Sequence, residues 1–298
     1  MKAVQLHEYG GPEKLMYEDV PTPEPGPDEV MLRVISTSVN PVDFKIRKGE
    51  LKAHMPVQFP VILGRDVAGE VVRVGLDVTR WKRGDLLMGL VNRSYAEFLT
   101  ARADALARIP EGLDPKDAGA LPLILETGAQ LIEKGIQPHA GETILVTGAA
   151  GSVGRAAVYV AKQHGAHVIA GVRGSQKAEM QGAGADSVVA LDDDAEIAGL
   201  PELDAIADTV GGETIMKVIP KLKKSGRIAS VVGKPEAPGI DVRAVWAQPD
   251  PERLYKLAED VRDGRLTIPV SKRMRLEDIR EAHKAAEHNA GGKIELLP

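Results

Sequence analysis

A glycine-rich turn at residues 146–154, VTGAAGSVG, is the stretch of this chain best suited to chemistry. Gly151 lets backbone approach a pyrophosphate, Gly154 lets a following helix lie close to the strand, and that helix presents free N–H groups to the anion. Ala149 stands where the G-x-G-x-x-G pattern has its first glycine. A tight turn without a ligand is the alternative for any isolated glycine pattern. The expected dinucleotide contacts are Thr147, Gly148, Ala149, Ala150, Gly151, Ser152, Val153 and Gly154.

Regular elements flank this turn on both sides. Residues 143–148 are β-branched and apolar, which is typical of a buried parallel strand. Apolar residues recur at helical spacing between Gly154 and Gly165, and residues 167–172 form a second apolar strand. A strand, a glycine turn, a helix and a strand within about thirty residues make the βαβ unit that holds a dinucleotide.

The end of the second strand indicates which dinucleotide binds. NAD sites place an acidic residue there, which binds the ribose 2′-hydroxyl. This chain reads GVRGSQK at 171–177, and Arg173, Ser175 and Lys177 could bind a 2′-phosphate, Arg173 through a bidentate contact. The alternative is that these cations only solvate a loop and a helix start. The missing acid favours NADPH over NADH.

Further strand candidates alternate with helix-length segments and lie at 187–192, 203–210 and 226–232. Ligands of such open sheets lie beyond the carboxyl ends of the strands. We therefore expect the loop at 208–212 to face the cofactor, together with Val232 and Gly233. These patterns predict a Rossmann-type doubly wound parallel sheet, of α/β class, over residues 118–261.

The two ends of the chain follow a different pattern. Residues 29–39 and 67–75 alternate apolar and polar side chains as half-buried strands do. Many short strands with glycine turns between them predict a distorted β-barrel, and no helical period of convincing length precedes about residue 114. We expect this domain to comprise residues 1–117. Helices are expected at 251–264 and 277–288.

Composition excludes several classes of protein. The 298 residues carry a net charge of −5 without a long block of like charge, which argues against nucleic acid or an anionic membrane as a partner. There is no cysteine, so disulfides, thiolate metal sites and a cysteine nucleophile are excluded. No apolar run reaches the length of a bilayer span, and the start lacks the apolar core of a signal peptide. We expect a cytoplasmic protein.

Five segments, in their order and spacing, resemble the medium-chain dehydrogenases/reductases of the quinone oxidoreductase type. They lie at 29–49, 60–75, 81–89, 148–154 and 282–296, so the resemblance covers essentially the whole chain. It implies a GroES-like catalytic domain built from both chain ends, in which residues 262–298 complete the 1–117 segment, with the Rossmann domain inserted between them. It also implies a homodimer, which is common among family members.

Zinc divides this family. Zinc-dependent relatives use a cysteine after the first barrel strand, a Gly-His-Glu segment and a four-cysteine lobe. Here Asp43 lies near the first position, Gly64-Arg65-Asp66 replaces the second, and the lobe has no counterpart. The seven histidines show no ligand spacing. We expect no catalytic metal; Arg65 and Asp66 could form an ion pair beside the cleft or a purely structural one.

Chemistry without a metal favours an activated C=C bond or a quinone as the hydride acceptor, because a few hydrogen-bond donors suffice to stabilise an enolate oxygen. Similar enone reductases carry N-P-x-D-x-K beside the nicotinamide, which implies Asn40 and Lys45 of NPVDFK as donors. Thr127 matches a position that contacts the nicotinamide side of the cofactor in relatives. Alternatively, Asn40 caps a turn, Lys45 points to solvent and Thr127 bonds to its own backbone.

The sequence thus predicts a zinc-independent, NADPH-dependent oxidoreductase that acts on a small α,β-unsaturated carbonyl compound or a quinone. One alternative is a non-catalytic NADPH-binding sensor or a crystallin-like protein, which would not need an intact NPVDFK segment. Another is a 2-enoyl thioester reductase, which would need a long groove and a basic patch for the carrier phosphates. Neither of those features is evident in the sequence.

Overall fold

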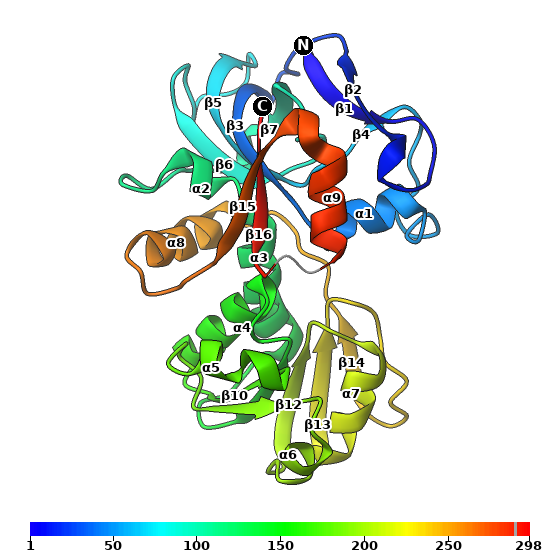
Figure 1. The fold of residues 1–298 in the computed structure, drawn as a ribbon. Coiled ribbons are helices and arrows are strands. Elements are labelled where there is room, and N and C mark those ends of the chain that lie inside the picture. Colours follow the sequence, from blue (N-terminus) through cyan, green and yellow to red (C-terminus); the bar gives the residue numbers. More distant parts are fainter. Residues whose placement is uncertain (289–290) are drawn as a thin grey trace. The chain divides into compact units, whose positions relative to one another are not determined.

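Two compact units make up the chain, which the computed structural model describes over residues 1–288 and 291–298. Unit 1 combines Met1–Leu123 with Pro249–Pro298, and unit 2 is Ile124–Gln248 (Figure 1). Unit 2 is therefore inserted into the sequence of unit 1. Residues 289–290, within the resembling segment 282–296, lie outside the described residues.

The boundaries of the units differ from those expected. The sequence pattern predicts that the inserted domain extends to residue 261. In the structure α8 (Pro251–Arg262) packs against β8 (Leu106–Arg108), and it therefore belongs to unit 1. Leu254 and Leu257 form the buried face of α8 at helical spacing. That spacing predicts the helix correctly, but it does not record which domain the apolar face contacts.

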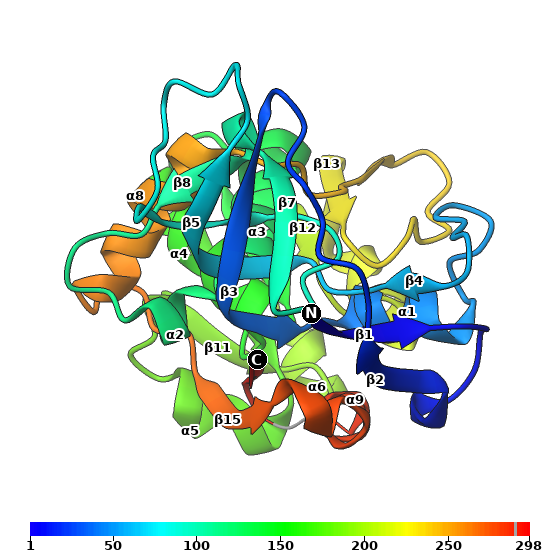
Figure 2. The ribbon, with the colours of Figure 1, turned by 90° about the horizontal axis from the view of Figure 1, so that it is seen from above.

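Unit 1 is mainly antiparallel β-structure. A sheet runs in the order β15-β16-β3-β5-β6-β8, with β7 also paired to β3, and a smaller sheet has the order β2-β1-β4. Figure 2 shows β3 between β5 and β7. The strands are β1 (Lys2–Leu6), β2 (Leu15–Asp19), β3 (Glu29–Val39), β4 (Val61–Ile62), β5 (Asp66–Val74), β6 (Leu86–Leu90), β7 (Phe98–Arg102), β8, β15 (Val270–Arg275) and β16 (Lys293–Leu297).

A short helix, α1 (Pro41–Lys48), occupies the NPVDFK segment, in which the sequence shows no helical period of convincing length. The helix was not predicted because eight residues are too few to show a period, although the end signals are present. Pro41 takes the first helical position, and the Asp43 carboxylate accepts the backbone N–H of Asn40 at 2.8 Å. Gly49 ends the helix with φ +78°.

Two hydrophobic clusters hold unit 1 together. One lies inside the curved sheet and includes inward-facing residues of the neighbouring strands β3, β5, β6 and β8, namely Val30, Leu32, Val67, Leu87 and Leu106. The other is built on the smaller sheet, α1 and α9 (Ile279–Glu287), and these two helices lie side by side (Figure 1). Unit 1 also contains the short helix α2 (Pro115–Ala118).

Unit 2 is a parallel six-stranded sheet of the order β11-β10-β9-β12-β13-β14. Numbered from β9, this is the order 3-2-1-4-5-6 of dinucleotide-binding sheets, with its switch point between β9 and β12. The structure confirms the expected fold class. The strands are β9 (Thr143–Thr147), β10 (His167–Val172), β11 (Ser187–Ala190), β12 (Leu203–Asp208), β13 (Leu222–Ser230) and β14 (Asp241–Ala244).

Helices connect these parallel strands. α4 follows β9 directly and packs on β9 and β10, as its buried residues Ala157, Val158 and Ala161 require. α3 begins at the end of the first segment of unit 1 and continues as a π-helical turn at Leu131–Ile136. The helices are α3 (Pro122–Gln130), α4 (Ser152–Gln163), α5 (Lys177–Met180), α6 (Asp194–Ala198) and α7 (Gly212–Val218).

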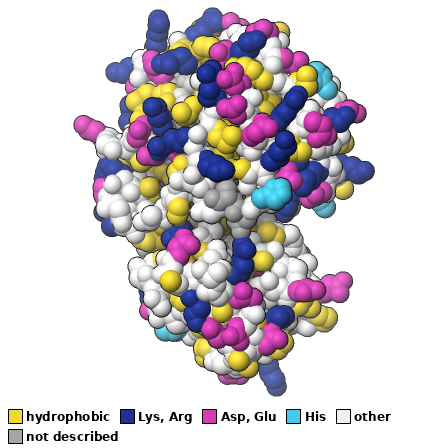
Figure 3. Space-filling view, viewed as in Figure 1, with side chains coloured by type: hydrophobic (Ala, Val, Ile, Leu, Met, Phe, Trp, Pro, Cys, Tyr) yellow, Lys and Arg dark blue, Asp and Glu magenta, His cyan; other side chains and the backbone are white. Residues whose placement is uncertain are grey.

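Charged side chains of both signs are interspersed on the face drawn in Figure 3. They cover the surface of each unit between small hydrophobic areas. Among the described residues, no helix has the length and apolar character needed to cross a bilayer.

Candidate functional site

The glycine turn of unit 2 leaves no room for side chains at two positions. A Cβ on Gly154 would clash with the carbonyl oxygen of Gly148 and lie 2.7 Å from Cα of Ala149. Gly148 has φ +63°, and a Cβ there would lie 2.5 Å from Oγ1 of Thr209. α4 starts directly after Gly151, and the first N–H groups of a helix have no acceptor within it. The turn therefore fits a bound pyrophosphate.

The predicted contacts along this turn differ in exposure. Thr147, Ala149 and Gly154 are buried, whereas Gly148, Ala150, Gly151, Ser152 and Val153 retain accessible surface. The first group shapes the turn from beneath. Only the second group presents atoms that a ligand could touch.

Asp208 ties together the carboxyl ends of three neighbouring strands. Its Oδ1 accepts hydrogen bonds from Oγ1 of Thr147 at 2.8 Å and from the backbone N–H groups of Val210 at 3.2 Å and Gly211 at 2.9 Å. Its Oδ2 accepts from Oγ of Ser230 at 2.8 Å. Thr147, Asp208 and Ser230 are the last residues of β9, β12 and β13. The Thr147 side chain is thus occupied in holding the loop after β12.

The loops after β12 and β13 lie close together at the same edge of the sheet. A Cβ on Gly211 would lie 2.9 Å from the side chain of Val232. Val210 and Val232 are 48% and 38% exposed, which is unusual for valine next to buried strands. Gly233 follows with φ +125°. These residues form a small apolar surface at the edge where dinucleotides bind in such sheets.

The cations beyond β10 are not equivalent. Arg173 and Ser175 are exposed. Lys177 instead forms an ion pair with Glu196, with Nζ–O distances of 2.7 and 2.8 Å. Sequence reasoning did not single out Arg155, although it directly follows the last glycine; its guanidinium donates to the carbonyl of Ala150 at 3.1 Å and pairs with Glu179. To bind a phosphate as predicted, Lys177 would have to break its ion pair with Glu196.

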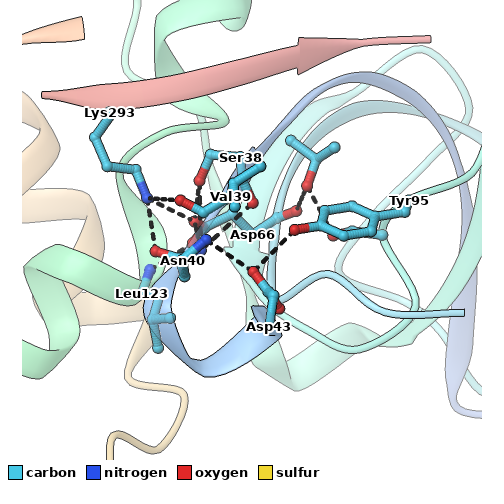
Figure 4. A network of polar contacts seen from close by, with 10 residues as sticks. Ser38, Val39, Asn40, Asp43, Asp66, Tyr95, Leu123 and Lys293 are labelled. Carbon is cyan, nitrogen blue, oxygen red and sulfur yellow. Dashed lines mark hydrogen bonds and ion pairs between the residues drawn. The ribbon is translucent and has the colours of Figure 1, made fainter. Parts of the chain in front are cut away.

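A buried polar network in unit 1 is centred on Asp66 (Figure 4). Its Oδ2 accepts from Nδ2 of Asn40 at 2.7 Å and from Oγ of Ser38, and it lies 3.4 Å from Nζ of Lys293. Its Oδ1 accepts the backbone N–H of Leu123 at 2.6 Å. Lys293 Nζ also donates to Oδ1 of Asn40 at 2.6 Å. Both ends of the Asn40 amide are therefore used inside unit 1.

Asp66 pairs with Lys293 and not with its sequence neighbour Arg65. The two possibilities considered for an Arg65–Asp66 pair are thus replaced by a long-range ion pair. Burial lowers the pKa of Lys293, and the nearby Asp66 carboxylate opposes that shift. Sequence reasoning missed Lys293 because a single lysine at the start of a strand carries no pattern that distinguishes it from a surface residue.

Asp43 forms a second buried part of this network. Burial raises its pKa to about 6, while the N–H of Asn40 and the hydroxyl of Tyr95 oppose the rise. Tyr95 is fully buried and donates to Oδ2 of Asp43 at 2.9 Å. Burial also raises the pKa of Tyr95 well above its ordinary value. Tyr95 therefore packs in the core and in addition fixes the Asp43 carboxylate of α1.

Two of the predicted catalytic residues lie apart from this network. Lys45 is half-buried in the last turn of α1, one residue before the buried Ile46. Thr127 lies in α3 and is 9% exposed. The structure thus brings Asn40 together with Asp66 and Lys293, and it places Lys45 on the same helix that Asn40 begins.

The donor set of unit 1 does not suit a zinc ion. Zinc binding needs three or four convergent Cys, His or carboxylate ligands. Over the described part of the chain, no group of three or more such residues could hold a metal. Asp66 already accepts hydrogen bonds on both oxygens, and Lys293 neutralises its charge.

Comparisons with known proteins agree with this architecture. Residues 26–111 match the alcohol dehydrogenase GroES-like domain, and residues 183–294 match a family described as zinc-binding dehydrogenase. A chloroplast envelope quinone oxidoreductase homolog of Arabidopsis thaliana is 30% identical over all of this chain and 98% of its own length. The chloroplastic NADPH-dependent alkenal/one oxidoreductase of the same plant is 33% identical over 80% of this chain and 64% of its own.

Solved structures extend the likeness to the whole fold. The quinone oxidoreductase of Coxiella burnetii superposes with a TM-score of 0.89 at 29% identity, covering 100% of this chain and 99% of that one. A mycobacterial protein in complex with NADPH gives a TM-score of 0.86 at 28% identity, with both chains fully covered. From the sheet order, the inserted unit and these full-length matches, we conclude that the chain belongs to the medium-chain dehydrogenase/reductase superfamily and is of the quinone oxidoreductase type.

Proposed function

We propose that this protein reduces activated C=C bonds of small α,β-unsaturated carbonyl compounds, or quinones, with NADPH as the reductant. The observation that carries the proposal is the turn in which Gly154 has no room for a Cβ, at the carboxyl edge of a sheet of order 3-2-1-4-5-6. The names of an alkenal/one oxidoreductase and a quinone oxidoreductase among its relatives support the choice of acceptor.

Binding of the cofactor falls to the carboxyl edge of unit 2. The N–H groups at the start of α4, with Gly151 and Ser152, bind the pyrophosphate. Arg173 and Ser175 bind the 2′-phosphate, because they are exposed directly beyond β10. Lys177 contributes less, since Glu196 already neutralises it. The loop with Val232 and Gly233 lines the remainder of the binding site.

Bound NADPH would supply the hydride, and the protein orients and polarises the acceptor. Lys45 donates a hydrogen bond to the acceptor oxygen. Asn40 is a positioning residue, because its amide is bonded to Asp66 and Lys293 and fixes the start of the helix that carries Lys45. Thr127 contacts the nicotinamide side of the cofactor. The proposal includes a homodimer, which light scattering of the purified protein would test.

An assay of NADPH consumption with small enones, enals and 1,2- or 1,4-quinones tests the activity. We expect turnover with at least one class, and Lys45→Ala should lower kcat while the Kd of NADPH, measured by fluorescence, stays nearly unchanged. Tight NADPH binding without turnover of any acceptor would support the sensor function instead. Turnover of 2-enoyl thioesters alone would support the thioester reductase.

Coenzyme preference tests the phosphate site separately. Arg173→Ala should weaken NADPH binding at least tenfold with little change for NADH, because a charge-assisted contact to phosphate contributes about 1.5–3 kcal/mol. Lys177→Ala should change the ratio of the two affinities much less, owing to its pair with Glu196. Equal weakening of both coenzymes in Arg173→Ala would place the 2′-phosphate elsewhere.

A further inference from the structure

Arg65 is a half-buried cation of unit 1. Its Nε is buried and has no hydrogen-bond acceptor. Over residues 1–288 and 291–298, no hydrogen bond or ion pair engages its guanidinium group. A charged nitrogen that is removed from water without an acceptor costs free energy. A ligand that supplies the missing acceptor would offset this cost.

The acidic neighbour of Arg65 is unable to fill this role. Asp66 directs both carboxylate oxygens to other partners, namely Ser38, Asn40, Lys293 and the backbone of Leu123. The positive charge of Lys293 already compensates its negative charge in a fully buried setting. Arg65 thus stands beside a carboxylate that is saturated, and its own donors stay available.

The backbone on both sides of Arg65 is held firmly. Its carbonyl oxygen accepts the N–H of Val91 at 2.8 Å, and the next residue begins the buried strand β5. The preceding Gly64 has φ +97°, and a Cβ there would lie 2.6 Å from the ring of Tyr95. The position from which the Arg65 side chain extends is therefore fixed, which limits the places that its guanidinium can reach, and donors held in place stabilise a developing charge most strongly.

We propose that the Arg65 guanidinium is a catalytic residue that binds the carbonyl or quinone oxygen of the acceptor. The inference rests on the proposed function and names a further residue for it. When the β-carbon of an enone gains a hydride, a C–H bond forms, the C=C π bond breaks and the electron pair moves to the carbonyl oxygen. Arg65 stabilises that enolate oxygen, and a proton from solvent then adds to the α-carbon. NADPH, a proton and the enone give NADP⁺ and the saturated ketone.

Arginine suits this role better than the amide first expected to serve it. Asn40 directs one N–H of its amide to Asp66 at 2.7 Å, and the same nitrogen lies 3.5 Å from the carbonyl oxygen of Ser38, so its donors face the network inside unit 1. The fork of donors on a guanidinium can hold one oxygen from two directions. Arg65 and Lys45 could both donate to the same oxygen, and single substitutions of each residue would separate their contributions.

Variants of Arg65 test the inference, with Arg83→Ala as the control because Arg83 is an exposed arginine of the same unit. For Arg65→Ala we expect kcat/KM for a small enone to fall roughly 10²-fold, as for the loss of a preorganised oxyanion donor. Arg65→Lys should retain part of the rate. The Kd of NADPH and the melting temperature should stay at wild-type values, and added guanidinium at a non-denaturing concentration should restore part of the Arg65→Ala rate.

Three outcomes would overturn the inference or its basis, and they differ from one another. If the wild-type protein reduces no acceptor, the proposed function itself fails. If the wild type is active and Arg65→Ala stays within about threefold of it, only the role of Arg65 fails. If Arg65→Ala loses NADPH affinity or thermal stability in step with rate, without rescue by guanidinium, Arg65 is structural.

Discussion

At the scale of single residues, the main feature of unit 1 is the buried ion pair of Asp66 and Lys293. The two residues are 227 positions apart in the chain and meet inside unit 1, where water cannot screen them. Hydrogen bonds from Ser38 and Asn40 satisfy the remaining capacity of the carboxylate. A buried pair of this kind contributes little net stability as a pair, but removal of one partner leaves an uncompensated charge.

Substitution of one partner should therefore be costly. Lys293→Met keeps most of the volume but strands the Asp66 carboxylate, and we expect the free energy of unfolding in urea to drop by about 3–5 kcal/mol. Adding Asp66→Asn removes the stranded charge and should recover part of that loss. The matched control Lys52→Met, at an exposed lysine, should change stability by only a few tenths of a kcal/mol. A small loss in Lys293→Met would show that the pair is solvated.

Asp43 and His283 should give opposite pH dependences. The folded-state pKa of Asp43 is about 6, above its unfolded value near 3.9. Between about pH 4 and 6 the folded state therefore binds more protons than the unfolded state, so the contribution of Asp43 to stability falls as pH rises. Burial and the charge of Arg47 lower the pKa of His283 in the folded state to about 3, whereas its unfolded value is near 6.5. Between these two pH values the unfolded state binds more protons, so the contribution of His283 to stability rises with pH.

Asp43→Asn should expose the contribution of Asp43. Between about pH 4 and 6, the free energy of unfolding of the variant should rise with pH more steeply than that of the wild type, by up to about 1.4 kcal/mol per pH unit. Urea titrations at several pH values measure both curves. Parallel curves over this window would contradict the raised pKa of Asp43.

At the scale of elements, the turn between β9 and α4 and the hydrogen bonds of Asp208 together shape the cofactor edge. Gly154 lets α4 begin against the backbone of Gly148, and Asp208 holds the neighbouring loop by two backbone N–H groups. The three strands that end at this edge are coupled by side chains, because Thr147 and Ser230 both donate to Asp208. A displacement of α4 would thus alter the surface that faces the phosphates.

Gly154→Ala tests this arrangement. The added Cβ meets backbone and not a flexible side chain, so α4 must shift away from β9, and we expect NADPH affinity to fall by more than tenfold with a loss of about 1–3 kcal/mol in stability. The control is Gly199→Ala, where a Cβ meets its nearest atom at an ordinary 3.5 Å and neither quantity should change appreciably. Unaltered NADPH affinity in Gly154→Ala would show that the turn does not form part of the cofactor site.

At the scale of the whole molecule, the inserted unit couples cofactor binding to the stability of the chain. A ligand that binds only the folded state stabilises it by about 2.7 kcal/mol at a hundred times its Kd. NADPH should therefore raise the melting temperature in a concentration-dependent way, and NADH at the same concentration should raise it less. Differential scanning fluorimetry with both coenzymes measures this. An equal rise with both would contradict the predicted preference for NADPH.

Prediction from sequence succeeded where the evidence is contiguous and failed where it is not. The strands and helix of residues 143–172 were predicted correctly, since their periodicities and glycines lie within one segment. α1 was missed, because eight residues carry capping signals but no period. The partners of Asn40 could not be predicted, since Lys293 lies in the last strand of the chain and Asp66 in a third segment.

The sequence by itself determined the parallel sheet and its glycine turn, because these follow from local periods, turn residues and the order of elements, and its family resemblance implied the insertion of one unit into another. Only the tertiary structure decided that Asp66 pairs with Lys293, that Lys177 is neutralised by Glu196 and that Nε of Arg65 is buried without an acceptor among the described residues. The physical reason is that a charge is satisfied by whatever group lies within a few ångströms in space, and the pattern within one segment does not record which distant segment folds against it.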